Sequence, residues 1–377
     1  MPQTSSNEAK RSTFLSFQPP AITEAEIDAV ADTLRSGWLT TGPRTAELEA
    51  RMREYLEAKH VLAVSSCTAA LHLSLVALGV GAGDEVITTS LTWPSTANVI
   101  VHCGATPVFA DVRADTLNVD PERVRELVTG RTKAIVPVDL YGQPADLDEL
   151  AALGVPIVED AAHAAESRYR GRKIGSIADL TCFSLYATKN IAAGEGGLIS
   201  TNRDDLAEAI DDLRVMRRGH GSTYDIAVPG YKANLSDVLS SIALVQLDKI
   251  EEHAAIRRRH VAIYEEGVAG LEGVEPVGRD PRDHHANHLF VVRITFANRD
   301  AVQQALGEEN IGTSIHFLPV HRLSAYRDRI APHQPPLPVT ERAGDEVLSL
   351  PLSPAHSDDD VRDAVAALHR VHARLAG

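Results

Sequence analysis

Residues 183–190 read Phe-Ser-Leu-Tyr-Ala-Thr-Lys-Asn, and the glycine-rich segment Gly194-Glu195-Gly196-Gly197 follows them. The apolar run from Thr181 to Leu185 predicts a buried strand. A single lysine, Lys189, follows shortly after the end of this strand. Burying an unpaired ammonium group is costly. Partial burial lowers the pKa of a lysine, and its free amine then becomes a nucleophile toward a carbonyl group. Most lysines are simply solvated, so the rest of the chain has to decide between the two interpretations.

Short apolar segments alternate with amphipathic stretches on both sides of this lysine. We predict strands at residues 61–64, 85–89, 107–110, 134–138, 155–158 and 198–201, with helices between them. This alternation is typical of an α/β domain whose largely parallel sheet is covered on both faces. Ligands of such sheets bind at the carboxyl ends of the strands. Residues that follow the predicted strands are therefore the candidates for a functional site.

The first of these strands ends in a small polar turn that opens a helix. Ser66, Cys67 and Thr68 lie in this turn. Free N–H groups and the helix dipole make such a helix start a phosphate-binding site. A plain Ser/Thr N-cap has the same appearance in a sequence.

An acidic residue ends another buried strand, in Val158-Glu159-Asp160-Ala161-Ala162-His163. Asp160 could partner a protonated ring nitrogen, although acids at this position are commonly N-caps. Trp93 could stack on a flat ring or belong to the core, and His163 could support either role. The glycine-rich segment does not match G-x-G-x-x-G, which argues against a nicotinamide site. Phosphate turn, aromatic ring, acid and Ser-x-x-x-x-Lys, in that order along one sheet, are the groups that pyridoxal phosphate (PLP) requires.

The bulk properties narrow the class of protein. A chain of 377 residues predicts two domains: a disordered tail over 1–12, a large α/β domain over 13–250 and a small α+β domain over 251–377. The net charge of −15 argues against nucleic acid or an anionic membrane as partner. No segment is apolar and long enough to span a bilayer, and the three cysteines have no paired spacing, which predicts a cytoplasmic enzyme. We predict no metal site.

The segment before the first strand predicts an amphipathic helix and an exposed loop. Ile22, Ile27, Val30 and Leu34 recur at helical spacing, with Thr23 as N-cap and a stop at Gly37. The loop that follows, residues 38–43, carries Trp38, Thr40 and Thr41.

The chain resembles the DegT/DnrJ/EryC1/StrS family of nucleotide-sugar aminotransferases. The resemblance covers roughly residues 14–355 and rests on SGWLTTGP, VSSCTAALHLSL, DEVITTSLTWPSTANVI, GATPVFADV, VPVDLYGQPADLDEL, VEDAAHA, CFSLYATKNIAAGEGGLI, PGYKANLSDVLSSIALVQL and IGTSIHF. It implies PLP fold type I, as in aspartate aminotransferase, with a mostly parallel seven-stranded sheet. Cys67, where many relatives carry glycine, and Leu185, where an aromatic residue is common, depart from the family pattern.

The resemblance also implies roles for the cofactor-site residues. Lys189 would form the Schiff base with PLP and move the proton, and Asp160 would pair with the pyridinium nitrogen. His163 would lie near the cofactor's O3′, and Trp93 would stack on the ring. The phosphate would bind at the turn of Ser66, Cys67 and Thr68, with the hydroxyl of Ser184. Asn234 would reach the phosphate of the other subunit's cofactor, which implies a homodimer with shared sites.

The implied reaction moves the amino group of L-glutamate to C4 of a nucleotide-linked 4-keto-6-deoxyhexose, which we expect to be dTDP-linked. Candidate substrate contacts are Thr40, Thr41, Tyr186, Lys232 and His316, with Arg217 and Arg218 as further cations for the diphosphate or as solvated loop charges. A C3-acting aminotransferase and a non-catalytic PLP-binding regulator remain as alternatives. A sister branch that removes the C3 oxygen carries histidine in place of the lysine, and Lys189 argues against it.

Overall fold

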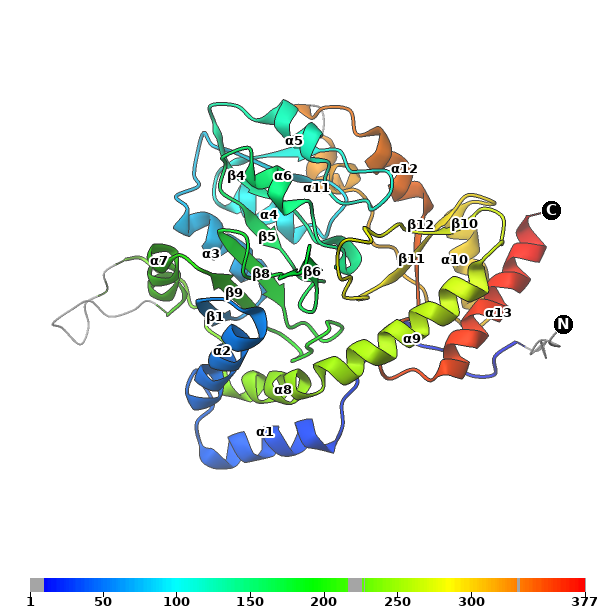
Figure 1. The fold of residues 1–377 in the computed structure, drawn as a ribbon, viewed down its shortest axis with the longest axis horizontal. Helices are drawn as coiled ribbons and strands as arrows, with labels where there is room; N and C mark the ends of the chain where they lie inside the picture. Colours follow the sequence, from blue (N-terminus) through cyan, green and yellow to red (C-terminus); the bar gives the residue numbers. More distant parts are fainter. Residues whose placement is uncertain (1–9, 216–225, 227, 331–332, 377) are drawn as a thin grey trace.

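The computed structural model describes residues 10–215, 226, 228–330 and 333–376, and within them seven strands form one large sheet (Figure 1). In spatial order these are β3 (Thr106–Ala110), β2 (Glu85–Thr89), β4 (Thr132–Val136), β5 (Val158–Asp160), β8 (Leu180–Ser184), β9 (Gly197–Thr201) and β1 (His60–Val64). Parallel bridges from Ile135 to Ile157 and from Val138 to Asp160 join β4 to β5. Only β9 runs against its neighbours among these strands. The predicted α/β class and mostly parallel sheet are confirmed.

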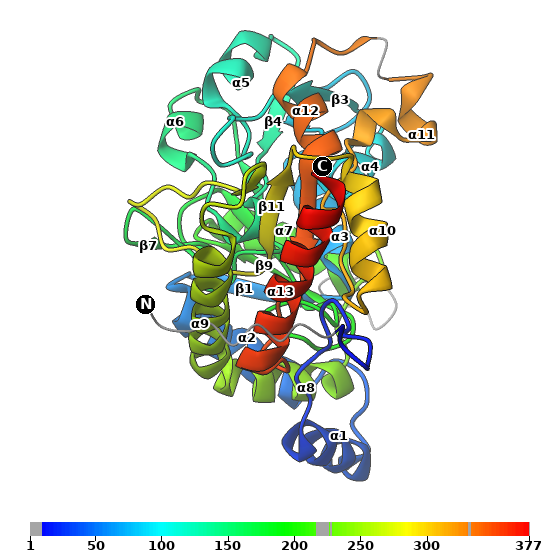
Figure 2. The same ribbon diagram turned by 90° about the vertical axis from the view of Figure 1, so that its right-hand side faces the viewer.

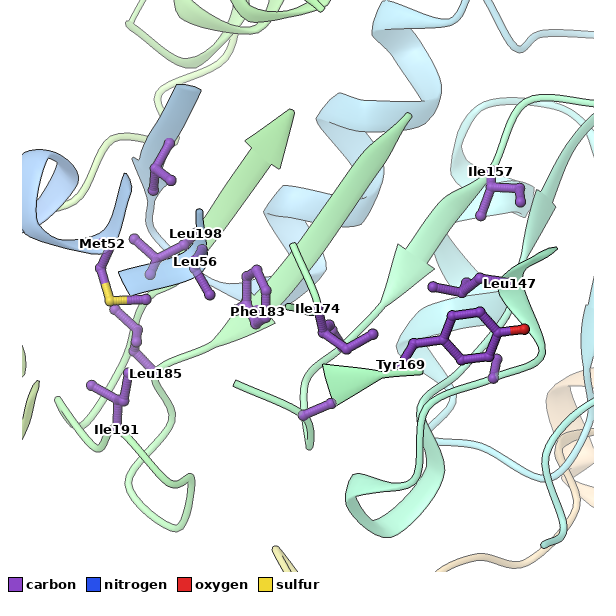
Figure 3. Packing of buried hydrophobic residues seen from close by; sticks show 14 of the residues in the cluster. Met52, Leu56, Leu147, Ile157, Tyr169, Ile174, Phe183, Leu185, Ile191 and Leu198 are labelled. Atoms are coloured by element: carbon purple, nitrogen blue, oxygen red, sulfur yellow. The ribbon is translucent and has the colours of Figure 1, made fainter. Parts of the chain in front are cut away.

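Helices cover both faces of the sheet, because alternate strand residues point to opposite sides. One face packs on α2 (Pro43–Leu56), α5 (Pro121–Leu127), α6 (Leu147–Ala151) and α8 (Asp237–Asp248). The other face packs on α3 (Cys67–Ala77), α4 (Ser95–His102) and α7 (Asp204–Val215). Figure 3 shows the first of these layers, in which Met52 and Leu56 of α2 lie near Phe183 and Leu198 of the sheet.

Two strands are displaced along the chain relative to the prediction, and a proline explains one boundary of each. The strand predicted at 134–138 is β4, which ends at Val136, and the strand predicted at 155–158 is β5, which begins at Val158. Pro137 and Pro156 have no N–H to donate, so the regular ladder is interrupted beside each of them.

The C-terminal part of the chain builds a smaller antiparallel sheet with its own apolar cluster. The sheet consists of β10 (Val274–Pro276), β11 (Phe290–Ile294) and β12 (Val347–Leu350). Against it pack α9 (Ile250–Val268), α10 (Arg299–Glu308) and α13 (Asp358–Leu375), which Figure 2 shows side by side. The remaining elements are the hairpin β6 (Arg168–Tyr169) and β7 (Arg172–Lys173), the short helices η1 (Leu140–Gly142), η2 (Val320–Arg322) and α11 (Ser324–Arg327), and α12 (Pro338–Glu346).

The start of the chain lies against this C-terminal unit. Leu15 belongs to its apolar cluster and forms a parallel bridge with Ile311. Arg11 pairs with Asp360 at 2.6 Å and with Asp363 at 2.8 Å, both on α13. Arg11, which the sequence assigned to a tail over residues 1–12, is thus held against α13, and the extent of that tail stays a prediction. The domain boundary at residue 250 stays a prediction.

The first helix, α1 (Glu24–Ser36), is capped as the sequence predicts but is only partly covered. Thr23 and Glu26 form a reciprocal capping box, and Gly37 ends the helix with φ of 75°. Glu26 accepts from Gln246 at 2.6 Å, which ties α1 to α8. The apolar side chains of Ile27 and Leu34 are nevertheless 53% and 54% exposed. No helix in the described part of the chain combines the length and the hydropathy that crossing a bilayer requires.

Candidate active site

A cavity of about 450 Å³ lies at the carboxyl ends of β5 and β8, where the helix α3 begins. Its lining includes many of the side chains singled out in the sequence: Ser66, Cys67, Thr68, Trp93, Asp160, His163, Ser184, Tyr186, Lys189 and His316. Strand ends and one helix start thus converge as the α/β pattern predicts.

Lys189 lies on the cavity wall in the loop between β8 and β9. The loop is folded on itself, since the N–H of Leu185 donates to Gly196 at 2.9 Å and that of Lys189 donates to Tyr186 at 2.8 Å. Burial lowers the pKa of Lys189 to about 8, against the opposing influence of Cys67 and Asp160. Gly196 has φ of 147°, where a side chain would be strained. The loop therefore presents an amine that loses its proton far more easily than a solvated lysine.

Asp160, at the end of β5, is the buried acid of the cavity. Its Oδ2 accepts the hydroxyl of Thr96 at 2.8 Å, and its Oδ1 accepts the N–H of Ala162 at 3.2 Å. Burial raises the pKa of Asp160, while Thr96, Ala162 and Lys189 act in the opposite direction. A cationic ring nitrogen brought against this carboxylate would complete its pairing.

The start of α3 forms a polar cradle on the same cavity. Ser66 is the N-cap, and its hydroxyl accepts the N–H of Ala69 at 3.0 Å. Thr68 donates its hydroxyl to Ser95 at 2.9 Å. A Cβ on Gly197 would lie 2.5 Å from the carbonyl carbon of Ser66, so glycine allows β9 to pass close to the helix start. This arrangement suits a phosphate group.

Two stacked histidines form another wall. The rings of His163 and His288 lie 4.4 Å apart at an interplanar angle of 27°. Burial holds the pKa of both rings well below the usual range, so both are neutral at pH 7. Burial also lowers the pKa of His316 to about 4, and its Nδ1 lies 2.9 Å from the Ser349 hydroxyl.

Sequence reasoning missed Thr96, His288 and Phe317, all of which line or support this cavity. Thr96 stands in a run of hydroxyl residues after β2, which was the one available signal. His288 and Phe317 come from the C-terminal part of the chain, and no periodicity connects them to the strand ends.

The structure gathers a second group of predicted residues outside the cavity lining. Asn234 donates its amide to the hydroxyl of Thr41 at 2.5 Å and accepts from Lys232 Nζ. Asn234 also bridges Val64, and the carbonyl of Thr40 accepts the N–H of Asp237 at 3.2 Å. Arg217 and Arg218 lie outside the described residues.

The cavity residues fit PLP by the chemistry of their donors and acceptors. The α3 start suits its phosphate, the Asp160 carboxylate suits its ring nitrogen, and the Lys189 amine suits its carbonyl carbon. The exposed face of Trp93, 63% accessible, leaves an aromatic surface beside the cavity on which a flat ring can stack.

Known proteins that resemble this chain in sequence are also aminotransferases or take part in polysaccharide biosynthesis. The model of the DegT/DnrJ/EryC1/StrS aminotransferase family matches residues 20–369. The spore coat polysaccharide biosynthesis protein SpsC of Bacillus subtilis is 41% identical over 96% of this chain and 98% of its own.

Two solved structures share the fold over nearly the whole chain. Spr1654 of Streptococcus pneumoniae, classed as a sugar aminotransferase and solved in its PLP form, superposes with a TM-score of 0.91 at 34% identity, covering 96% of this chain and 99% of that one. DesI, solved in the presence of its TDP-sugar product, gives 0.89 at 33% identity, covering 97% and 94%. The predicted enzyme class, aminotransferase, and the predicted cofactor, PLP, are confirmed. The chain belongs to the DegT/DnrJ/EryC1/StrS aminotransferase family.

Proposed function

We propose that the protein transfers the amino group of L-glutamate to the C4 carbonyl of a dTDP-linked 4-keto-6-deoxyhexose. The main support for transamination is that Lys189, Asp160 and the start of α3 line one cavity. Three unpaired cysteines suit an enzyme of the cytoplasm, which we propose as its location.

PLP, when bound, supplies an electron sink for the carbanion character that develops during amino transfer. Asp160 would keep the ring nitrogen protonated, and the hydroxyl of Thr96 would hold that carboxylate in place. Cys67 and Thr68 would hold the phosphate with their backbone N–H groups. These residues would hold the ring in the cavity that Lys189 also lines.

Lys189 Nζ would take a proton from one carbon and return it to another. A pKa of about 8 suits this task, because a base acts best when its pKa is near the working pH. Hydrogen bonds within the loop would hold the Lys189 amine close to the reacting carbons through both half-reactions.

The choice of C4 and of dTDP rests on sequence and on one relative. His163 and the segment 230–235 resemble C4-acting enzymes, and DesI was solved with a TDP-sugar product. Lys232 would supply a positive charge for the diphosphate in an otherwise acidic protein. Thr40, Thr41, Tyr186 and His316 would contact the sugar.

We further propose a homodimer with shared sites. The apolar side chains of Ile27 and Leu34 on α1, of Ile22 before it, and of Trp38 and Leu39 after it are each about half exposed. Beside them an apolar groove of about 360 Å³ reaches Ala187 and Gly194 in the loop of residues 185–196, between β8 and β9. A second copy covering this surface would bury it. It would also bring its own Asn234 and Lys232, which lie outside their own chain's cavity lining, to the neighbouring site.

A panel of substrates tests the reaction. Purified enzyme would receive glutamate with dTDP-, UDP- or GDP-linked 4-keto and 3-keto sugars, and NMR would identify the products. We expect turnover with the dTDP 4-keto sugar. Activity on a 3-keto sugar alone would favour the C3-acting alternative, and no turnover with any of these amino acceptors would favour a non-catalytic regulator.

A further inference from the structure

A chain of buried polar groups leads from α9 to the stacked histidines. Arg257 of α9 donates to Glu166, whose other carboxylate oxygen accepts the amide of Asn190. The Asn190 oxygen then lies 2.9 Å from Nδ1 of His288. All four side chains are buried, and none of them was part of the sequence-based site.

The partners of Asn190 determine which way its amide points. A carboxylate held by a guanidinium accepts hydrogen bonds only, so the Asn190 nitrogen must face Glu166. The same nitrogen lies 3.3 Å from the carbonyl of Ala286, a second acceptor. The amide oxygen is left for His288.

This orientation selects one tautomer of His288, and a backbone N–H selects the tautomer of His163. Because the amide oxygen of Asn190 can only accept, Nδ1 of His288 must carry the proton, and Nε2 is an acceptor. His163 is the reverse case, since its Nδ1 accepts the N–H of Tyr141 at 3.2 Å and its Nε2 must therefore carry the proton. Neither Nε2 atom has a hydrogen-bond partner among the described residues.

We propose that Asn190, oriented by Glu166 and Arg257, fixes His288 in the Nδ1-protonated tautomer, so that the stacked pair offers the cavity one acceptor, on His288, and one donor, on His163. Both rings line the cavity that holds Lys189. The donor suits an anionic oxygen and the acceptor suits a hydroxyl or a water molecule. Asn190 is thus a positioning residue, and the inference does not depend on which sugar is the substrate.

The first test is the tautomeric state of the wild-type protein. Two-bond nitrogen–proton correlation spectra of the ¹⁵N-histidine-labelled holoenzyme and cofactor-free protein separate pyrrole-like from pyridine-like ring nitrogens. His288→Gln and His163→Gln spectra assign the signals. We expect a protonated Nδ1 on His288 and a protonated Nε2 on His163. A protonated Nε2 on His288 would overturn the proposal without any need for a further variant.

Variants of Asn190 then test the cause. Asn190→Ala should remove the preference, giving mixed or reversed tautomer signals for His288. Asn98→Ala is the matched control, because the amide oxygen of Asn98 accepts instead from Tyr326 at 2.6 Å. An unchanged His288 tautomer in folded Asn190→Ala protein would show that Asn190 does not set it.

Discussion

Thr96 donates its hydroxyl to Oδ2 of Asp160 at 2.8 Å, joining the first turn of α4 to the end of β5. The bond lowers the pKa of a carboxyl that burial raises. It therefore favours the charged form, which the ring nitrogen of the cofactor needs.

Replacing Thr96 with valine keeps the shape of the side chain and removes that bond. A hydrogen bond to a charged group contributes about 1.5–3 kcal/mol, so we expect kcat to fall about tenfold or more. Thr88→Val, which loses a buried hydroxyl bonded to the carbonyl of Val136 at 2.8 Å, is the control for general destabilisation. Equal kcat values for the two variants would show that the Thr96 bond does not matter.

Lys189 should capture PLP in a pH-dependent way. Its pKa of about 8 means that the reactive free amine increases as the pH rises through 8 and is lost as the pH falls below it. Stopped-flow absorbance should thus show the rate of covalent capture by cofactor-free protein rising from pH 6.5 and levelling above about 9. Lys189→Ala should give no borohydride-fixed adduct and a kcat lower by about a thousandfold. A fixed adduct elsewhere in the chain would contradict the assignment.

Asp160→Asn removes the charge and keeps the size of the side chain. Loss of a charge that stabilises the transition state costs about a hundred- to a thousandfold in kcat, while PLP should still bind through the helix start and Lys189. Equilibrium dialysis and single-turnover kinetics separate the two effects. Full activity in this variant would mean that another acid partners the ring nitrogen.

Lys232 is predicted to hold the diphosphate of the substrate. Because a contact of this kind is the same in ground and transition state, Lys232→Ala should raise KM for the nucleotide sugar and leave kcat nearly unchanged. An exposed charge pair is worth up to about 1 kcal/mol, or a few-fold in KM. Lys133→Ala, another exposed lysine, is the matched control. A fall in kcat with an unchanged KM would assign Lys232 a different role.

Mixed dimers test whether Asn234 acts across the subunit boundary. Inactive Lys189→Ala chains mixed with inactive Asn234→Ala chains should regain up to about half of the wild-type activity per site in co-purified heterodimers, because one of the two sites combines the intact halves. Native mass spectrometry confirms the pairing. Heterodimers as inactive as either parent would place Asn234 in its own chain's site.

Features that depend on neighbouring residues could be predicted from the sequence, whereas contacts between distant segments could not. Local propensities predict that the first helix begins after Thr23 and ends at Gly37. Asp160 and Lys189 were expected to lie close together because parallel strands end at a shared edge of the sheet. His288 lies far along the chain in a loop without periodicity, so its stacking on His163 depends on tertiary packing alone. The spacing of Ile27 and Leu34 predicted an apolar face but could not say whether this chain covers it.

The place of β1 at the edge of the sheet has a consequence for biosynthesis. It precedes every other strand in the chain, yet its partner is β9, with Val64 opposite Gly197. A ribosome adding ~5–20 residues per second needs roughly ten seconds to make the intervening segment. During that time the turn at Ser66 has no strand beside it. The start of α3 therefore cannot gain its neighbouring strand until the loop that carries Lys189, which precedes β9 in the chain, has been synthesised.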